Sequence, residues 1–195
     1  MKKHCTSRLP KSGYPIKKRP VPKARYISEI FRLSLAVSGI STAYRLHAEQ
    51  LPCPITSPLN VTTEVTNAIT CNNYSALNIN SPDGAFVKSG AGVFNNQTGS
   101  SFINDNRLRN YGELNNFAGA TFTNQLGASF TNTNRVSNVG ALVNDGDMLT
   151  REQVINSGIL TNNGTLTDDY DGGGGYYGTL TNTGTLNNHG TINQS

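Results

Sequence analysis

Residues 178–195 read GTLTNTGTLNNHGTINQS, which is three units of six residues in succession. Each unit starts with glycine, and an apolar residue (Leu180, Leu186 or Ile192) follows two positions later. In the first two units, asparagine comes two positions after the leucine. Side chains alternate between the two faces of a β-strand, so this spacing puts the apolar residue and the asparagine on the same face.

The same spacing recurs from residue 91 onward. Successive apolar positions are separated by 6, 8 or 14 residues, always an even number. A helix would need spacings of three and four, so the pattern predicts strands whose apolar residues all point inward. The pairs with asparagine are Phe94/Asn96, Phe102/Asn104, Leu108/Asn110, Leu114/Asn116, Phe122/Asn124, Phe130/Asn132, Val136/Asn138, Leu142/Asn144, Val154/Asn156, Leu160/Asn162, Leu180/Asn182 and Leu186/Asn188. Three pairs have another polar partner, namely Met148/Thr150, Leu166/Asp168 and Ile192/Gln194.

These strands predict an all-β fold, a parallel β-helix in which short coils stack along one axis. Fifteen strands at three per coil make five coils, and two strands per coil is the alternative. All eight prolines lie at or before Pro82, so none removes a backbone donor from the repeats. Glycine two residues before many of the apolar positions suits a corner that needs a positive φ or a close approach. The predicted coils start near Phe94, Leu114, Val136, Val154 and Leu180.

Asparagine beside a core residue needs an explanation, because burying a lone amide costs on the order of a few kcal/mol. Coils stacked about 4.8 Å apart let each amide bond to the amide of the next coil, as a ladder. We expect six residues to show this arrangement most clearly: Leu160, Leu180, Leu186, Asn162, Asn182 and Asn188.

The composition fits a narrow core, with 35% hydrophobic residues, 14% charged residues and no Trp. The net charge of +4 is unevenly distributed, because residues 1–48 contain eleven Lys or Arg and one acid. Residues 49–195 contain five basic and eleven acidic residues, a net charge of −6. No basic stripe lies downstream to neutralise phosphates, so we expect no nucleic-acid partner.

Residues 1–48 have the parts of a secretory signal. A basic, proline-rich stretch precedes Leu33–Tyr44, which is uncharged, and small residues follow. Twelve residues are too few to span a bilayer, which needs about 20. We therefore expect export, the alternatives being a disordered basic tail or a misassigned start codon.

Residues 49–90 are interpreted as an entry or cap region that precedes the repeat region at 91–195. Two cysteines, Cys53 and Cys71, lie within it, whereas Cys5 would leave with the leader. A bridge between Cys53 and Cys71 would close a 19-residue loop and stabilise the fold by about 3 kcal/mol. Two inert buried thiols are the alternative.

The run GTLTNTGTLNNHGTIN, with looser copies upstream over residues 85–195, resembles the passenger repeats of Gram-negative autotransporters and filamentous-haemagglutinin-like adhesins. The resemblance implies a right-handed parallel β-helix displayed outside the cell, serving adhesion or spacing. Glycans or a host surface protein would be its partners, and an outer-membrane translocator would export it.

The sequence departs from that pattern in three ways. No C-terminal membrane barrel follows the repeats, the paired Asn-Pro motifs of two-partner secretion have only a distant echo at 80–84, and five coils are few. We therefore expect a fragment of a longer passenger, a truncated product without its own function, or a chain whose barrel is encoded separately. The last coil has no cap, which predicts self-association through its open edge.

Residues 168–177 form the one insertion, where a step of 14 replaces a step of 6. Its carboxylates Asp168, Asp169 and Asp171 could hold Ca²⁺ through oxygen ligands, although the calcium-binding nonapeptide is not matched. We favour a plain solvated loop. His189 is interpreted as a solvated turn residue. Thr-x-Thr pairs, as at Thr121, fall on different strands of their coils, which argues against an ice-binding face.

A polysaccharide lyase or hydrolase is the enzymatic alternative, because such enzymes need clustered acids with Lys or Arg in a groove. The basic residues downstream of the leader are scattered, and only Arg151 and Glu152 are adjacent. A hexapeptide acyltransferase is disfavoured because its small residue would directly follow the aliphatic one. We therefore expect a non-catalytic protein without a cofactor.

Overall fold

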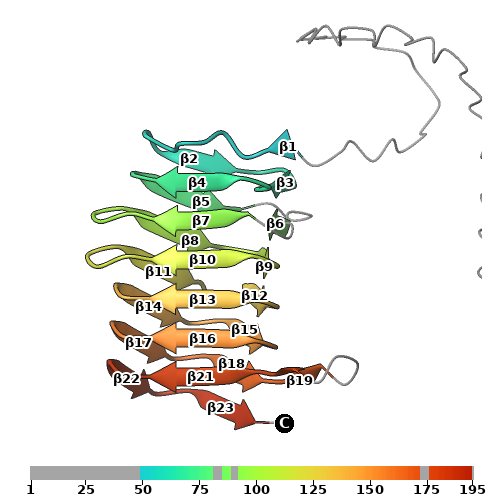
Figure 1. The fold of residues 1–195 in the computed structure, drawn as a ribbon, viewed down its shortest axis with the longest axis vertical. Coiled ribbons are helices and arrows are strands. Elements are labelled where there is room, and N and C mark those ends of the chain that lie inside the picture. The colour runs from blue at the N-terminus through green and yellow to red at the C-terminus, as the bar shows by residue number, and fades with distance from the viewer. Residues whose placement is uncertain (1–48, 81–84, 89–91, 172–175, 195) are drawn as a thin grey trace, which may run out of the picture. The chain divides into compact units, whose positions relative to one another are not determined.

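The computed structural model describes residues 49–80, 85–88, 92–171 and 176–194, all as strands, turns and loops. Figure 1 shows these residues as a stack of coils with β1 at one end and β23 at the other. The predicted leader at 1–48, with its export signal, lies outside the described residues.

The strands lie in three parallel sheets, one on each side of the coil. Sheet A contains β1 (Glu49–Gln50), β3 (Val65–Thr66), β6 (Ala85–Lys88), β9 (Arg107–Asn110), β12 (Ser129–Asn132), β15 (Asp147–Thr150), β18 (Thr165–Asp168) and β23 (Thr191–Gln194). Sheet B contains β4 (Thr70–Asn73), β7 (Val93–Asn96), β10 (Glu113–Asn116), β13 (Arg135–Asn138), β16 (Gln153–Asn156) and β21 (Thr179–Asn182). Sheet C contains β2 (Leu59–Val61), β5 (Ala76–Ile79), β8 (Ser101–Asn104), β11 (Thr121–Asn124), β14 (Ala141–Asn144), β17 (Ile159–Asn162) and β22 (Thr185–Asn188).

Each strand pairs with the strand one coil away, in the register that the sequence predicts. In sheet B, the residues that align are the five predicted coil starts, Phe94, Leu114, Val136, Val154 and Leu180. The chain visits sheets B, C and A in turn, so the choice of three strands per coil is confirmed. The predicted parallel β-helix is confirmed with it.

The apolar residue of each repeat points inward and forms one continuous core. Four phenylalanines, one of them Phe122 with no exposed surface, stack near the middle with ring centroids 4.9–5.1 Å apart. Leu160 is fully buried as predicted. Leu180 and Leu186 are only partly buried against this core, because no described residue covers the last coil.

The predicted asparagine ladders run along the inside of the three corners. Each upstream amide donates from Nδ2 to Oδ1 of the asparagine one coil further on, at 2.6–2.8 Å in sheets B and C. The sheet B ladder contains Asn73, Asn96, Asn116, Asn138, Asn156 and Asn182. The sheet C ladder contains Asn104, Asn124, Asn144, Asn162 and Asn188. The sheet A ladder contains Asn110, Asn132 and Thr150.

The ends of the ladders differ from their middles. Asn162 is buried, but Asn182 and Asn188 are exposed and accept a hydrogen bond only from the coil before them. At the other end, Ile79 occupies the ladder position before Asn104. Asn104 Oδ1 is consequently buried without a hydrogen-bond partner among the described residues. Asn182 and Asn188 therefore contribute less to the ladders than the sequence predicts, because no described asparagine accepts a hydrogen bond from them.

Two kinds of glycine form the corners. Gly99, Gly119 and Gly127 have φ between 76° and 81°, and each lies in one of the longer corners that create a step of eight. At the short corners, as at Gly146, a Cβ atom would lie 2.3 Å from a backbone oxygen of the coil before. The positive φ and the close approach are thus separate requirements, met at different corners.

The coils extend into the region at 49–90, because β1–β6 join the same three sheets. Val65/Asn67 and Cys71/Asn73 have the spacing of the later repeats, and both asparagines are fully buried. The paired positions Leu77 and Phe86 are nine residues apart, an odd step. That step interrupts the even pattern from which the repeat can be recognised.

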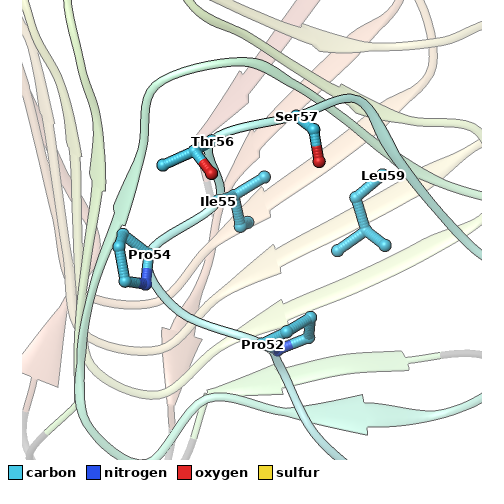
Figure 2. A pocket seen from close by; sticks show the side chains of 6 residues that line it. All are labelled: Pro52, Pro54, Ile55, Thr56, Ser57 and Leu59. Carbon is cyan, nitrogen blue, oxygen red and sulfur yellow. The ribbon is translucent and has the colours of Figure 1, made fainter.

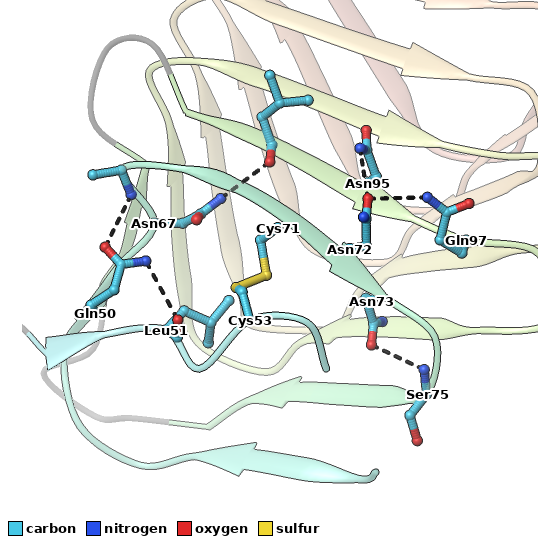
Figure 3. The surroundings of a disulfide bond; sticks show 12 residues. Gln50, Leu51, Cys53, Asn67, Cys71, Asn72, Asn73, Ser75, Asn95 and Gln97 are labelled. Carbon is cyan, nitrogen blue, oxygen red and sulfur yellow. Dashed lines mark hydrogen bonds between the residues drawn. A yellow bond between two sulfur atoms is a disulfide. The ribbon is translucent and has the colours of Figure 1, made fainter. Parts of the chain in front are cut away.

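A disulfide joins Cys53 to Cys71, with their Cα atoms 5.2 Å apart. Cys71 lies on β4 and is fully buried, whereas Cys53 belongs to the segment that crosses the first coil. Figure 3 shows the bridge between this segment and β4, with Leu51 nearby on the same segment. The bridge therefore attaches the N-terminal segment to the body of the solenoid.

Replacing both Cys53 and Cys71 with serine is expected to lower the free energy of unfolding by about 3 kcal/mol, because the bridge closes a loop of 19 residues in the unfolded chain. Urea unfolding followed by circular dichroism measures the change. Wild-type protein treated with a reductant should lose a similar amount. An unchanged midpoint in both cases would contradict the prediction.

Candidate interaction surfaces

The outer face of sheet C has no charged side chain on any of its seven described strands. Its outward positions carry Ala, Ser, Thr, Asn, Val and Ile, for example Thr121 and Thr123 on β11. The turns that lead from sheet B to sheet C, called here the B/C corners, are also uncharged in the described structure. One side of the solenoid thus presents neutral groups only.

Charged residues lie on the other sides. Arg107 and Arg109 are on the outer face of β9 in sheet A, and Asp147 is on the same sheet. Arg151 forms an ion pair with Asp169, with 3.4 Å between Nε and Oδ2. Both side chains are substantially exposed, and such a pair contributes at most about 1 kcal/mol.

The insertion at 168–177 forms a small antiparallel hairpin of β19 (Tyr170–Asp171) and β20 (Tyr176–Tyr177). Asp168 precedes it in the position where asparagine stands in other coils, and Asp169 pairs with Arg151. The side chain of Asp171 lies outside the described residues, so the predicted calcium ligands are not seen together. The described residues contain no group of three or more His, Cys, Asp or Glu that could hold a metal.

Burial raises the pKa of Asp168 above its ordinary value, and the neighbouring Asp169 carboxylate raises it further. A raised pKa in the folded state means that the ionised form opposes folding. The penalty is absent below the unfolded pKa, and it develops as the pH rises through the folded pKa.

Replacing Asp168 with asparagine is therefore expected to stabilise the protein at neutral pH and to stabilise it less at acidic pH. The variant also offers an amide in the ladder position of sheet A. Urea unfolding at both pH values measures the difference. Asp147→Asn removes the same charge from the outer face and is the matched control. An Asp168→Asn effect equal at both pH values would contradict the sign argued here.

The N-terminal end has a shallow cavity of about 100 Å³. Figure 2 shows its lining, which is mostly apolar with two hydroxyl groups. The lining residues are Pro52, Pro54, Ile55, Thr56, Ser57 and Leu59. Sites for small molecules usually enclose about 300–1,000 Å³, so this cavity is a gap in the covering of the first coil.

The last coil has a second cavity, of about 220 Å³, at the open end of the core. Leu166, Leu180 and Ile192 contribute its apolar wall, and Ile192 is 40% exposed. The outer strand edges here have no partner strand among the described residues. Backbone donors and acceptors at such an edge can pair with another chain.

The structure also shows where His189 and the Thr-x-Thr pairs lie. His189 follows β22 and is exposed, and its backbone N–H donates to Asn162 O. The Thr-x-Thr pairs that flank core residues, Thr121/Thr123, Thr165/Thr167 and Thr179/Thr181, lie on β11, β18 and β21, which belong to sheets C, A and B. As predicted from the sequence, the pairs therefore do not stack on one face.

The fold and its surfaces define a class of protein: a three-sided parallel β-solenoid with internal amide ladders and one neutral side. Comparisons with known proteins found no matching family model, no matching curated protein and no matching solved structure. In the part of the chain that the structure describes, no helix is long and apolar enough to cross a membrane.

Proposed function

We propose that the protein is exported and acts as a surface-displayed adhesive solenoid, part of an autotransporter-like or haemagglutinin-like passenger, without catalytic activity. The observation that carries this proposal is the neutral side, where sheet C and the B/C corners present a regular, uncharged array. Partners on this side would be glycans or a host surface protein. Export would require an outer-membrane translocator.

Two further features support an adhesive and structural role. Amide ladders and short corners make each coil depend on its neighbours, which suits an extended stalk. The disulfide is also typical of proteins that leave the reducing cytoplasm. Among the described residues, Arg151 and Asp169 form a substantially exposed ion pair, and no pair of acid and base lines either of the two cavities described above.

Binding of the purified, labelled chain to host cells and to immobilised glycans tests adhesion, and a fusion of residues 1–48 to a periplasmic reporter enzyme tests export. We expect saturable binding, an active reporter and no release of sugars from a polysaccharide panel. A reporter that stays in the cytoplasm would refute export. Binding to neither cells nor glycans would refute adhesion, and release of sugars that one acidic substitution abolishes would establish an enzyme.

The open edge of the last coil is expected to pair with a second copy of the chain. Sedimentation velocity over a range of protein concentrations measures this association. A dimer that grows with concentration is the expected result, and a monomer at every concentration would contradict it.

A further inference from the structure

We infer that the B/C corners of the first described coils bind a neutral, unbranched polysaccharide that lies along the solenoid axis. The inferred site, called here the B/C edge, consists of the corner residues Tyr74, Gln97, Phe117 and Val139 and the outer amides Asn72, Asn95 and Asn115. This inference rests on the proposed adhesive function and assigns it a place and a ligand class.

The corner residues occupy equivalent positions in four successive coils. The backbone N–H of each donates to a carbonyl oxygen of the coil before it, for example Gln97 to Asn73 and Phe117 to Asn96. Tyr74 is 54% exposed, Phe117 is 38% exposed and Val139 is 45% exposed. The B/C corners therefore carry three exposed apolar side chains that the core does not use, with the polar Gln97 between Tyr74 and Phe117.

The spacing of the two aromatic rings suits a chain of sugars. Tyr74 and Phe117 stand two coils apart, which is about 10 Å at the usual distance between neighbouring strands. That separation is close to the length of a disaccharide unit in an extended polysaccharide. An exposed ring face can stack on the apolar face of a sugar while the sugar hydroxyls remain hydrated.

Amide groups for the hydroxyls lie next to these corner side chains, on the outer face of sheet B. Asn95 Nδ2 donates to Asn72 Oδ1 at 2.9 Å, and Asn115 Nδ2 donates to Asn95 Oδ1 at 3.0 Å. Gln97 Nε2 also donates to Asn72 Oδ1, so the corner and the ladder are joined, as Figure 3 shows. An amide has two N–H donors and two acceptor lone pairs, so Asn95 keeps half of its capacity for a ligand.

The longer corners make this edge more prominent in the same coils. The turns at 97–100 and 117–120 project beyond the sheets in Figure 1, further than the turns that follow β13 and β16. They stack through Thr98 Oγ1 donating to Ala118 O and Gly99 N donating to Gly119 O. Hydrogen bonds between neighbouring coils thus hold the two projecting turns in place without a ligand.

Charge selects the class of ligand. The described B/C corners carry no Asp, Glu, Lys or Arg, and neither does the adjoining face of sheet C. On the outer face of sheet B, Glu113 and Arg135 are paired positions on neighbouring strands, so the two opposite charges lie side by side at the far end of those strands from the corners. At the corners, an acidic polysaccharide or a charged protein surface would lose its hydration without gaining an ion pair. A neutral glycan meets hydrogen-bonding amides and ring faces, which are the groups that it can use.

Titration of the full chain with soluble hexasaccharides tests the inference. The probes are cellohexaose, mannohexaose and N-acetylchitohexaose, with hexagalacturonate as the acidic comparison. We expect at least one neutral hexasaccharide to bind, more tightly than its disaccharide, and the acidic one not to bind. Tyr74→Ala and Phe117→Ala should each weaken binding about tenfold, and the double variant should not bind measurably.

Tyr111→Ala is the matched control, because Tyr111 is 42% exposed at a corner between sheets A and B. Its affinity should equal that of the wild type, and all variants should unfold cooperatively at urea midpoints close to that of the wild type. Failure of every neutral hexasaccharide to bind, or equal losses in Tyr111→Ala and Phe117→Ala, would overturn the inference. Host-cell binding that survives the double variant would overturn the site but leave the adhesive function standing, with a protein receptor as the partner.

Discussion

Phe122→Ala is expected to lower the free energy of unfolding by about 3–5 kcal/mol, the usual cost of truncating a buried phenylalanine. Phe122 has no exposed surface, and its ring lies between those of Phe102 and Phe130, with centroids 5.0 Å and 5.1 Å away. The coils cannot collapse into the gap, because their separation is fixed by backbone hydrogen bonds on three sides.

Urea unfolding measures this change, with Phe117→Ala as the control. Phe117 is an exposed residue of a B/C corner, so its truncation should cost less than about 1 kcal/mol. Equal losses in the two variants would mean that the side-chain burial described above does not decide stability. The same control shows whether the B/C edge can be altered without unfolding the protein.

Asn124→Ala is expected to cost about 3–5 kcal/mol, although asparagine is a polar residue in an apolar core. Asn124 Nδ2 donates to Asn144 Oδ1 at 2.7 Å and to Asp147 O at 3.1 Å, and Asn124 Oδ1 accepts from Asn104 at 2.7 Å. The substitution therefore leaves several buried polar groups short of a partner, each costing about 1–3 kcal/mol.

Two further variants test whether stability depends on the hydrogen bonds of the ladder and on position within it. Asn124→Asp keeps the shape but loses the donor, so its carboxylate would face Asn144 Oδ1 and should destabilise the protein at least as much. Asn188→Ala, at the exposed end of the same ladder, should cost only about 1 kcal/mol. Measured losses that do not depend on position in the ladder would contradict this account.

The sequence predicts most of the coil, because a strand's alternation links side-chain direction to residue number. The inward apolar residues and asparagines follow from even spacing between positions such as Phe94 and Leu114. Even spacing allows either two or three strands per coil, and the structure decides for three and so confirms the five predicted coil starts. The extent of the solenoid does not follow, because the odd step between Leu77 and Phe86 breaks the even pattern. Corner residues lie outside the strands, so their number is not restricted by the alternation.

The surface is less predictable than the core. Neither the neutral side nor the B/C edge containing Tyr74 and Phe117 is visible in the linear sequence, because those residues are 43 positions apart. Corners of two and four residues must first be distinguished before such positions can be aligned. Asp168 shows the same limit, since its raised pKa depends on a neighbour and on burial that only the fold supplies.

Uniform pairing from coil to coil also bears on how this chain can change in length. Neighbouring strands match residue for residue, as β11 and β14 do, so a whole coil could be duplicated or deleted and the flanking coils would meet in the same register. Insertion of a single residue within a strand would instead turn its core residue outward and its surface residues inward. Genes of this kind are therefore expected to grow and shrink by complete coils, with the length of the solenoid as the quantity that varies.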